Sequence, residues 1–293
     1  MKKRNLLFLG VLALLVVIVG GIFLFSKQPQ KDVPSKPEVK TDVVEAESPN
    51  PSDDEKNLPN FIDVKNTEEL RALFKGVRFD RIPRIFVRRF PKDFAEKGDS
   101  ALFATVLLPY ILRENELLAD ERKVFLFLSP KVERGEELTD VENAMWDKLV
   151  YKYEVLDPDK TGQRETLFNR IDRISPALAV AQALEATNLG KEDLDAPFDV
   201  RRWNDKKEYV FVRYPNLAEA VTDYALEINR GYSYLKFHML RTAQRASLYH
   251  PFLGRSFARG MVYYKLEDPD YVRKLDEIFK WYKIKKLDES KFE

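Results

Sequence analysis

The chain has 293 residues, of which 44% are hydrophobic and 33% charged, so it is long enough to bury a substantial core beneath a well-solvated surface. It contains no cysteine, which excludes disulfides, thiolate zinc sites, cysteine nucleophiles and a lipoprotein anchor. Its 49 Lys and Arg residues nearly balance its 48 Asp and Glu residues, and a formal net charge of +1 gives no support to nucleic-acid binding.

Residues 1–26 predict a transmembrane signal anchor. Lys2, Lys3 and Arg4 precede an unbroken apolar run from Leu6 to Phe25. A helix of about twenty residues spans the roughly 30 Å hydrocarbon core, and its basic flank stays in the cytoplasm. A cleaved signal peptide is the alternative, but its apolar region is usually shorter and ends in small residues, whereas this run ends in bulky ones. We therefore expect one span, with everything after Ser26 outside the cytoplasm.

Residues 27–60 predict a disordered linker. The segment is rich in Pro, Ser, Asp, Glu and Lys, and six prolines interrupt any helix. We expect it to act as a spacer between the membrane and the folded region.

Residues 61–160 predict an N-terminal helical subdomain. A helix is expected to begin at a threonine cap, Thr67, with carboxylates in its first turn. Apolar spacing predicts a long helix over 100–128, which Pro109 should kink or break. Another helix is expected to begin at Thr139 and to carry Trp146 among its apolar residues.

Residues 161–293 predict a second, mainly helical subdomain. The one convincing strand pattern covers 207–214, where aromatic and β-branched residues lie among charges. Further helical spacing covers 218–228, 233–247, 254–264 and 270–283. The two histidines, His238 and His250, are too few for a histidine-rich metal site and are expected at the surface or an interface, so hydrolytic chemistry would have to rest on carboxylates.

Several segments agree, in order and spacing, with one family of envelope enzymes. The first are Arg81 to Pro91, Leu107 to Glu116 with its E-N-E turn, and Ile174 to Gly190. The match continues through Tyr214-Pro215-Asn216-Leu217, Asn229, Tyr234, Gly260, Tyr264 and Tyr271-Val272. On these residues, over about 80–287, the chain resembles the Bax-type glucosaminidases of bacterial envelopes.

This resemblance implies a mainly α, lysozyme-like glucosaminidase domain in 161–293, related to glycoside hydrolase family 73 and the flagellar peptidoglycan hydrolases. Such enzymes cut peptidoglycan after N-acetylglucosamine, with one glutamate as general acid and with neither cofactor nor metal. The acid needs a raised pKa, which partial burial beside the cleft supplies. With the predicted anchor, the resemblance implies a single-pass protein of the bacterial inner membrane whose C-terminal domain lies in the periplasm.

The general acid is the point at which the chain departs from the family. The family motif A-Q-A-x-x-E-S-x-W-G corresponds to Ala181 through Gly190, and without a gap the acid's position is Ala186. Glu185 lies one residue earlier, about 100° around the helix, and is expected to be a solvated carboxylate pointing away from the cleft. A compensated gap is the alternative, and it would place Glu185 in the acid's role.

The far wall of the cleft is also reduced. The family's long glycine-rich lobe is replaced by residues 191–207, which contain no glycine. Without that wall, water is not excluded from a reacting sugar. Asp193, Asp195 and Asp199 in this segment are expected to be surface or capping residues rather than replacement acids.

Two functions follow, with a third left open. The first is a non-catalytic scaffold that binds peptidoglycan glycan strands or an envelope protein partner through a groove lined by Gln182, Asn229, Tyr234 and Tyr264. The second is an active peptidoglycan β-N-acetylglucosaminidase that uses Glu185. A purely structural protein without wall contact is the third. An outward Glu185 would argue against the enzyme, and an inward one in a closed cleft would argue for it.

Overall fold

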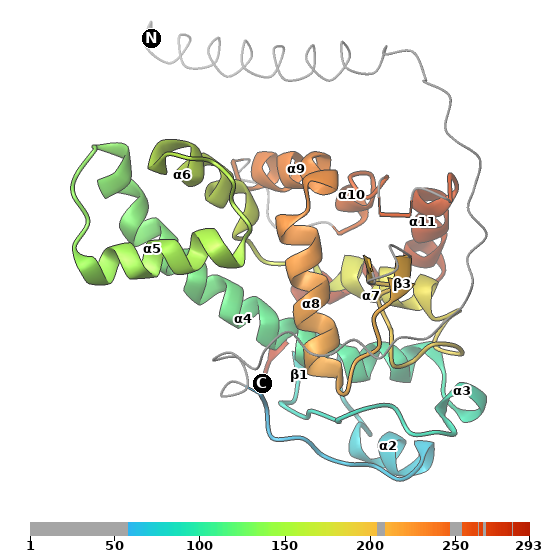
Figure 1. Ribbon diagram of the computed structural model, residues 1–293. Helices are drawn as coiled ribbons and strands as arrows, with labels where there is room; N and C mark the ends of the chain where they lie inside the picture. Colours follow the sequence, from blue (N-terminus) through green and yellow to red (C-terminus); the bar gives the residue numbers. More distant parts are fainter. Residues whose placement is uncertain (1–57, 204–208, 247–253, 263, 266–267, 283) are drawn as a thin grey trace, which may run out of the picture. The chain divides into compact units, whose positions relative to one another are not determined.

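The computed structural model describes residues 58–293, apart from 204–208, 247–253, 263, 266–267 and 283 (Figure 1). The described residues are mainly helical, as expected, with two small two-stranded sheets. The predicted anchor and residues 27–57 of the predicted linker lie outside this part of the chain. Among the described residues, no helix is both long and apolar enough to cross a membrane.

The first described helix is α2 (Thr67–Leu73), and its N-cap residue lies one position before the predicted cap, Thr67. Its N-cap is Asn66, whose Oδ1 accepts from the backbone N–H of Glu69 at 2.9 Å. Thr67 instead donates through both its N–H and its hydroxyl to Oδ1 of Asp93, the residue before α3 (Phe94–Lys97). Asparagine caps a helix at least as well as threonine, which leaves Thr67 available for this tertiary contact.

The long helix α4 (Ser100–Glu133) is continuous, so the expectation that Pro109 breaks it is wrong. Every residue from 106 to 112 is buried, including Pro109 itself. A proline in a helix interior costs about 3 kcal/mol. Burying several large apolar side chains contributes about 1.5–3 kcal/mol each, which outweighs that loss.

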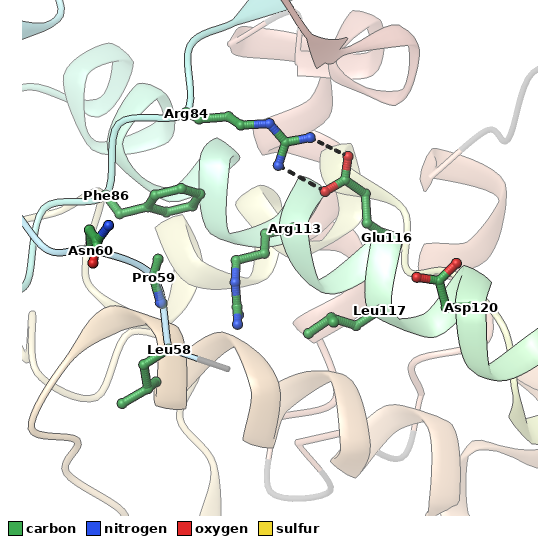
Figure 2. A pocket seen from close by; sticks show the side chains of 9 residues that line it. All are labelled: Leu58, Pro59, Asn60, Arg84, Phe86, Arg113, Glu116, Leu117 and Asp120. Atoms are coloured by element: carbon green, nitrogen blue, oxygen red, sulfur yellow. Dashed lines mark hydrogen bonds and ion pairs between the residues drawn. The ribbon is translucent and has the colours of Figure 1, made fainter. Parts of the chain in front are cut away.

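The E-N-E turn of α4 joins three distant segments. Glu116 forms a bidentate ion pair with Arg84, with N···O distances of 2.6 and 3.0 Å (Figure 2). Asn115 exchanges two hydrogen bonds with the backbone of Ile174, at 2.8 and 2.9 Å. The buried Glu114 carboxyl accepts from the Thr222 hydroxyl at 2.7 Å, and burial raises its pKa.

Helix α5 (Asp140–Lys152) begins after Thr139, as the sequence predicts. Thr139 and Glu142 form a reciprocal capping box at the start of α5. Trp146 is fully buried, and its indole N–H donates to Gln163 on α6 (Lys160–Arg170) at 2.8 Å. Because α4 packs against α5, α6, α7 and α8, one core continues across residue 160.

Helix α7 (Pro176–Ala186) is the central element of the described chain, because every residue from 176 to 184 is buried. It packs against α4, α10 (Gly254–Ala258), α11 (Tyr271–Trp281) and η3 (Ile284–Glu289). Its many alanines allow these neighbours to approach closely. Asp288 on η3 accepts from the hydroxyl of the cap residue Ser175 and from the N–H of Ala177, which fixes the start of the helix.

The remaining C-terminal helices lie close to their expected ranges. They are α8 (Leu217–Arg230), η2 (Tyr232–Tyr234), α9 (Leu235–Ala246) and α11, whereas α10 is shorter than the predicted 254–264. The predicted strand appears as β3 (Tyr209–Phe211), antiparallel to β2 (Arg201–Trp203) with Arg201 opposite Phe211. A second, parallel pair joins β1 (Arg81–Ile82) to β4 (Lys291–Phe292). Two-residue strands are too short to show alternation, so the sequence pattern missed them.

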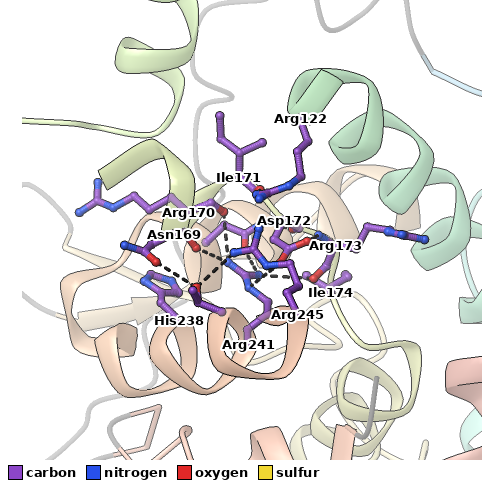
Figure 3. A network of polar contacts seen from close by, with 12 residues as sticks. Arg122, Asn169, Arg170, Ile171, Asp172, Arg173, Ile174, His238, Arg241 and Arg245 are labelled. Carbon is purple, nitrogen blue, oxygen red and sulfur yellow. Dashed lines mark hydrogen bonds and ion pairs between the residues drawn. The ribbon is translucent and has the colours of Figure 1, made fainter. Parts of the chain in front are cut away.

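A buried charge network connects the α6–α7 junction to α9 (Figure 3). The Asp172 carboxylate faces the Nε atoms of Arg241 and Arg245 at 3.4 and 3.0 Å. Arg241 is fully buried and also donates to Asn229 Oδ1 at 2.6 Å and to the backbone carbonyl of Asn169 at 2.8 Å. Burial lowers the pKa of Arg241 to about 10, so it remains charged at neutral pH.

His238 belongs to this buried region, so the expectation that it lies at the surface or an interface is wrong. It is 3% exposed, and its Nε2 lies 2.7 Å from the Ile228 carbonyl oxygen. Only a protonated Nε2 can donate to that carbonyl. Burial, and then the charge of Arg241, lower the pKa of His238 to about 3, so the ring is neutral. Helical spacing alone does not say which face of α9 is covered. His250 lies outside the described residues.

His238 predicts a pH-dependent stability. Because its folded pKa lies below the unfolded value near 6.5, the unfolded chain binds the extra proton, and stability falls as pH drops below about 6.5. Between pH 7 and pH 5 we expect His238→Gln to lose about 2 kcal/mol less unfolding free energy than the wild type. Urea denaturation at both pH values measures this. Parallel pH dependence in the two proteins would contradict the assignment.

Candidate functional site

Glu185, in the last turn of α7, points into the protein rather than into solvent. Its side chain is 11% exposed, and its Oε2 accepts from the Lys265 ammonium at 2.7 Å. The expectation of a solvated carboxylate is therefore wrong. The reason is that α7 is buried on all sides, so a rotation of about 100° around it turns a side chain from one covered face to another.

Lys265 connects Glu185 to a second carboxylate. The same ammonium lies 2.8 Å from Asp199 Oδ2, and Arg201 Nε lies 3.0 Å from Asp199 Oδ1. The Asp199 side chain is 7% exposed, which corrects the expectation of a surface or capping residue. Asp193 and Asp195 are exposed and pair with Arg213, as expected of surface residues.

These four side chains form a neutral cluster, which we call the Lys265 cluster: Glu185, Asp199, Arg201 and Lys265. Burial alone would lower the pKa of the Lys265 ammonium, but the charges and hydrogen bonds of Asp199 and Glu185 outweigh burial and raise the pKa. Lys265 is therefore a permanent cation near neutral pH. Two carboxylates and two cations in one place balance each other, which lets all four be withdrawn from water.

The spacing of the two carboxylates is relevant to glycosidase chemistry. Because both oxygens contact one Nζ atom, they are at most about 5.5 Å apart, close to the roughly 5–5.5 Å separation in retaining glycosidases. Here, however, the space between them holds the Lys265 ammonium. A sugar ring could enter only if Lys265 moved away.

Gln182 lies one turn before this cluster and is 1% exposed. Its Oε1 accepts from the Tyr224 hydroxyl at 2.6 Å, and its Nε2 donates to the Tyr271 hydroxyl at 2.9 Å. Tyr271 in turn stacks on Tyr264, with ring centroids 5.6 Å apart. Gln182 is thus part of a buried polar core.

The other predicted groove residues are also engaged inside the protein. The Tyr264 ring is partly buried, and its hydroxyl donates to the Phe198 carbonyl. Tyr234 is buried beside it, with ring centroids 6.0 Å apart. Asn229 is fully buried and donates to the Asp172 carbonyl at 3.0 Å, so it belongs to the Asp172–Arg241 network instead. The predicted tyrosines and Gln182 do lie close together, but they pack inside the protein and do not line a groove.

The segment after α7, which the sequence predicts to lack the family's cleft wall, packs into the protein. Phe198 is fully buried and stacks on Tyr224, with ring centroids 4.2 Å apart. The turn that starts this segment has positive φ at Asn188, Leu189 and Gly190. A Cβ atom at Gly190 would lie 3.1 Å from the Phe103 ring, which explains the glycine there.

Two hollows on the surface of the described chain are lined neither by the Lys265 cluster nor by the predicted groove residues. One has a volume of about 480 Å³ and lies beside α4, around Arg113 (Figure 2). The other, of about 400 Å³, lies between residues 89–95 and the segment after α7. No group of three or more His, Asp or Glu side chains among the described residues is arranged to hold a metal ion.

The Lys265 cluster predicts an asymmetric response to mutation. Lys265→Met leaves two buried carboxylates without their shared cation and should lower the unfolding free energy by about 3 kcal/mol or more. Glu185→Gln keeps the Lys265–Asp199 pair and should cost only about 1 kcal/mol. Lys274→Met, which removes an exposed lysine paired with Asp268, is the control and should cost less than about 1 kcal/mol.

Urea denaturation followed by tryptophan fluorescence gives the three values. Equal losses for Lys265→Met and Lys274→Met would show that the cluster does not stabilise the fold. A larger loss for Glu185→Gln than for Lys265→Met would show that Glu185 has a role outside the ion pair.

Comparison of the chain with protein-family models, with curated proteins and with solved structures gives no significant match. The glucosaminidase resemblance over residues 80–287 therefore stays a prediction.

Proposed function

We propose that this chain is a membrane-anchored, cell-wall-facing domain of the bacterial envelope, with a lysozyme-like glucosaminidase architecture that has lost catalysis. In this proposal it acts as a scaffold that binds peptidoglycan or an envelope protein partner. Its N-terminal helix holds it in the inner membrane as a single-pass protein, and its C-terminal domain lies in the periplasm.

The observation that carries the proposal is the ion pair between Glu185 and Lys265. A general acid must hold a proton and deliver it to the glycosidic oxygen. Glu185 Oε2 instead accepts a hydrogen bond from a permanent cation, and that cation is shared with Asp199. At Ala186, the ungapped position of the acid, there is no carboxylate.

Packing around the cluster supports the same conclusion. The hydrogen-bonding groups of Gln182 are taken up by Tyr224 and Tyr271, and the Phe198 ring fills the space against Tyr224. A sugar needs an open surface with aromatic faces and unoccupied polar groups. The polar and aromatic side chains near the end of α7 contact each other instead, so we expect binding elsewhere on the domain.

An active β-N-acetylglucosaminidase is the second candidate, favoured by one observation. The Glu185 and Asp199 oxygens that contact Lys265 are at most about 5.5 Å apart, a limit compatible with the carboxyl spacing of retaining glycosidases. Glu185 would serve as general acid and Asp199 as nucleophile. This reading requires Lys265 to leave the space between them when substrate binds.

The topology can be tested in spheroplasts. Because Lys2, Lys3 and Arg4 precede an apolar run that ends in bulky residues, we expect an uncleaved anchor with the domain outside the cytoplasm. External protease should therefore remove the domain while a cytoplasmic marker survives. A protected domain, or a soluble form whose N-terminus lies near residue 27, would contradict this topology.

The loss of catalysis can be tested on purified peptidoglycan. We expect the full-length chain in detergent to cause no turbidity loss, while a lysozyme control clears the same suspension. Ala186→Glu should restore little or nothing, because a carboxylate without a water-excluding wall keeps an ordinary pKa and is mostly ionised at neutral pH. Clearing by the wild type that disappears in Glu185→Gln would establish the second candidate instead.

A further inference from the structure

The hollow beside α4 combines patches of apolar surface with one cation, Arg113, that has no hydrogen-bond or ion-pair partner among the described residues. Phe86, Leu117 and Pro59 contribute apolar surface, and Arg113 extends into the space from α4 (Figure 2). Its volume of about 480 Å³ is within the usual range for small-ligand sites. The hollow is formed by segments far apart in the sequence, at residues 58–60, 84–86 and 113–120.

The charges around the hollow leave Arg113 unneutralised. Glu116 is held by Arg84 through two hydrogen bonds, and Asp120 pairs with Lys123 at 2.7 Å. Among the described residues, the Arg113 guanidinium has neither a hydrogen bond nor an ion pair. Figure 2 shows it directed away from the Arg84–Glu116 pair, with no contact drawn to the other lining residues. The lining therefore offers one free guanidinium.

We propose that this hollow binds the free C-terminal carboxylate of a short peptide whose last side chain is small and apolar. A planar guanidinium matches a carboxylate through two parallel hydrogen bonds. A single free cation suits a ligand group with one negative charge, and a chain with net charge +1 is not adapted to a polyanion. The surfaces of Phe86 and Leu117 beside Arg113 accommodate an alkyl side chain.

The source of such a peptide rests on the proposed function. Peptide stems of peptidoglycan end in alanine residues with a free carboxylate, which is the chemistry that this hollow fits. The domain would then contact the wall through its peptide stem rather than through its glycan strand. The carboxylate site itself depends only on Arg113 and its surroundings.

The test uses N-acetyl-D-alanyl-D-alanine as the probe and its C-terminal amide as the control ligand. Titration into the full-length chain in detergent, followed by calorimetry or NMR, should show binding of the acid and at least tenfold weaker binding of the amide. Arg113→Gln should weaken binding of the acid by about tenfold or more, and Arg113→Lys by less, because lysine keeps the charge but not the planar fork.

The matched control is Arg259→Gln, which removes an exposed arginine outside the hollow and should leave the affinity unchanged. Since Arg113 forms no hydrogen bond or ion pair in the described chain, Arg113→Gln should melt at the wild-type temperature. Equal binding of acid and amide, no binding at millimolar peptide, or equal affinity of Arg113→Gln and the wild type would overturn the inference.

Binding to intact sacculi separates this inference from the proposed function. If the wild type and Arg113→Gln bind sacculi equally, the wall-facing scaffold stands and the Arg113 site is wrong. If the dipeptide binds through Arg113 but sacculi do not bind, the carboxylate site stands and the wall function is wrong. Sacculus binding that Arg113→Gln weakens along with dipeptide binding supports both.

Discussion

The burial of α7 on all sides is the constraint on which the rest of this structure depends. A helix without a solvated face must satisfy each of its polar groups within the protein, because an unpaired buried polar group costs about 1–3 kcal/mol and an unpaired charge more. Gln182 meets this requirement through two tyrosine hydroxyls. Glu185 meets it through Lys265, which Asp199 shares. The polar residues that the sequence marks as chemically interesting are thus the ones that the interior has to neutralise.

The need to neutralise buried charge also explains why the Glu185 carboxylate differs from a catalytic acid. Partial burial in an apolar pocket raises the pKa of a carboxyl group. Burial does so at Glu114, which accepts a hydrogen bond from the Thr222 hydroxyl and forms no ion pair with any described residue. At Glu185 the ammonium of Lys265 lies within hydrogen-bond distance. Glu114 is the more deeply buried of the two glutamates, and only Glu185 has a cation as its hydrogen-bond donor among the described residues. The proposed loss of catalysis rests on that difference. Because the side chains around Glu185 are engaged with one another, we expect any binding function on the protein surface.

Charged side chains also hold the helices in their arrangement. Asp172 and Arg241 tie the α6–α7 junction to α9, while Asn115 and Glu116 tie α4 to the start of α7 and to Arg84. Each of these groups has an ion-pair or hydrogen-bond partner within the protein, whereas Arg113 has none among the described residues. An arginine that has no partner in the described part of the chain, beside apolar surface in a hollow, is a group that these residues do not use to hold the fold together. This contrast is the basis for assigning it to a ligand.

The sequence by itself determined the features that depend on neighbours along the chain. The capping box at Thr139, the spacing of α8 and α11 and the predominance of helix are all local, since caps and periodicity act within a few residues. Only the tertiary structure decided that α4 runs through Pro109, that β1 pairs with β4, and that His238 is buried. It alone brought Lys265 to Glu185, eighty positions earlier in the chain. Local patterns carry no information on such pairings, because they arise when buried charges at distant positions must balance one another in a shared, water-free interior.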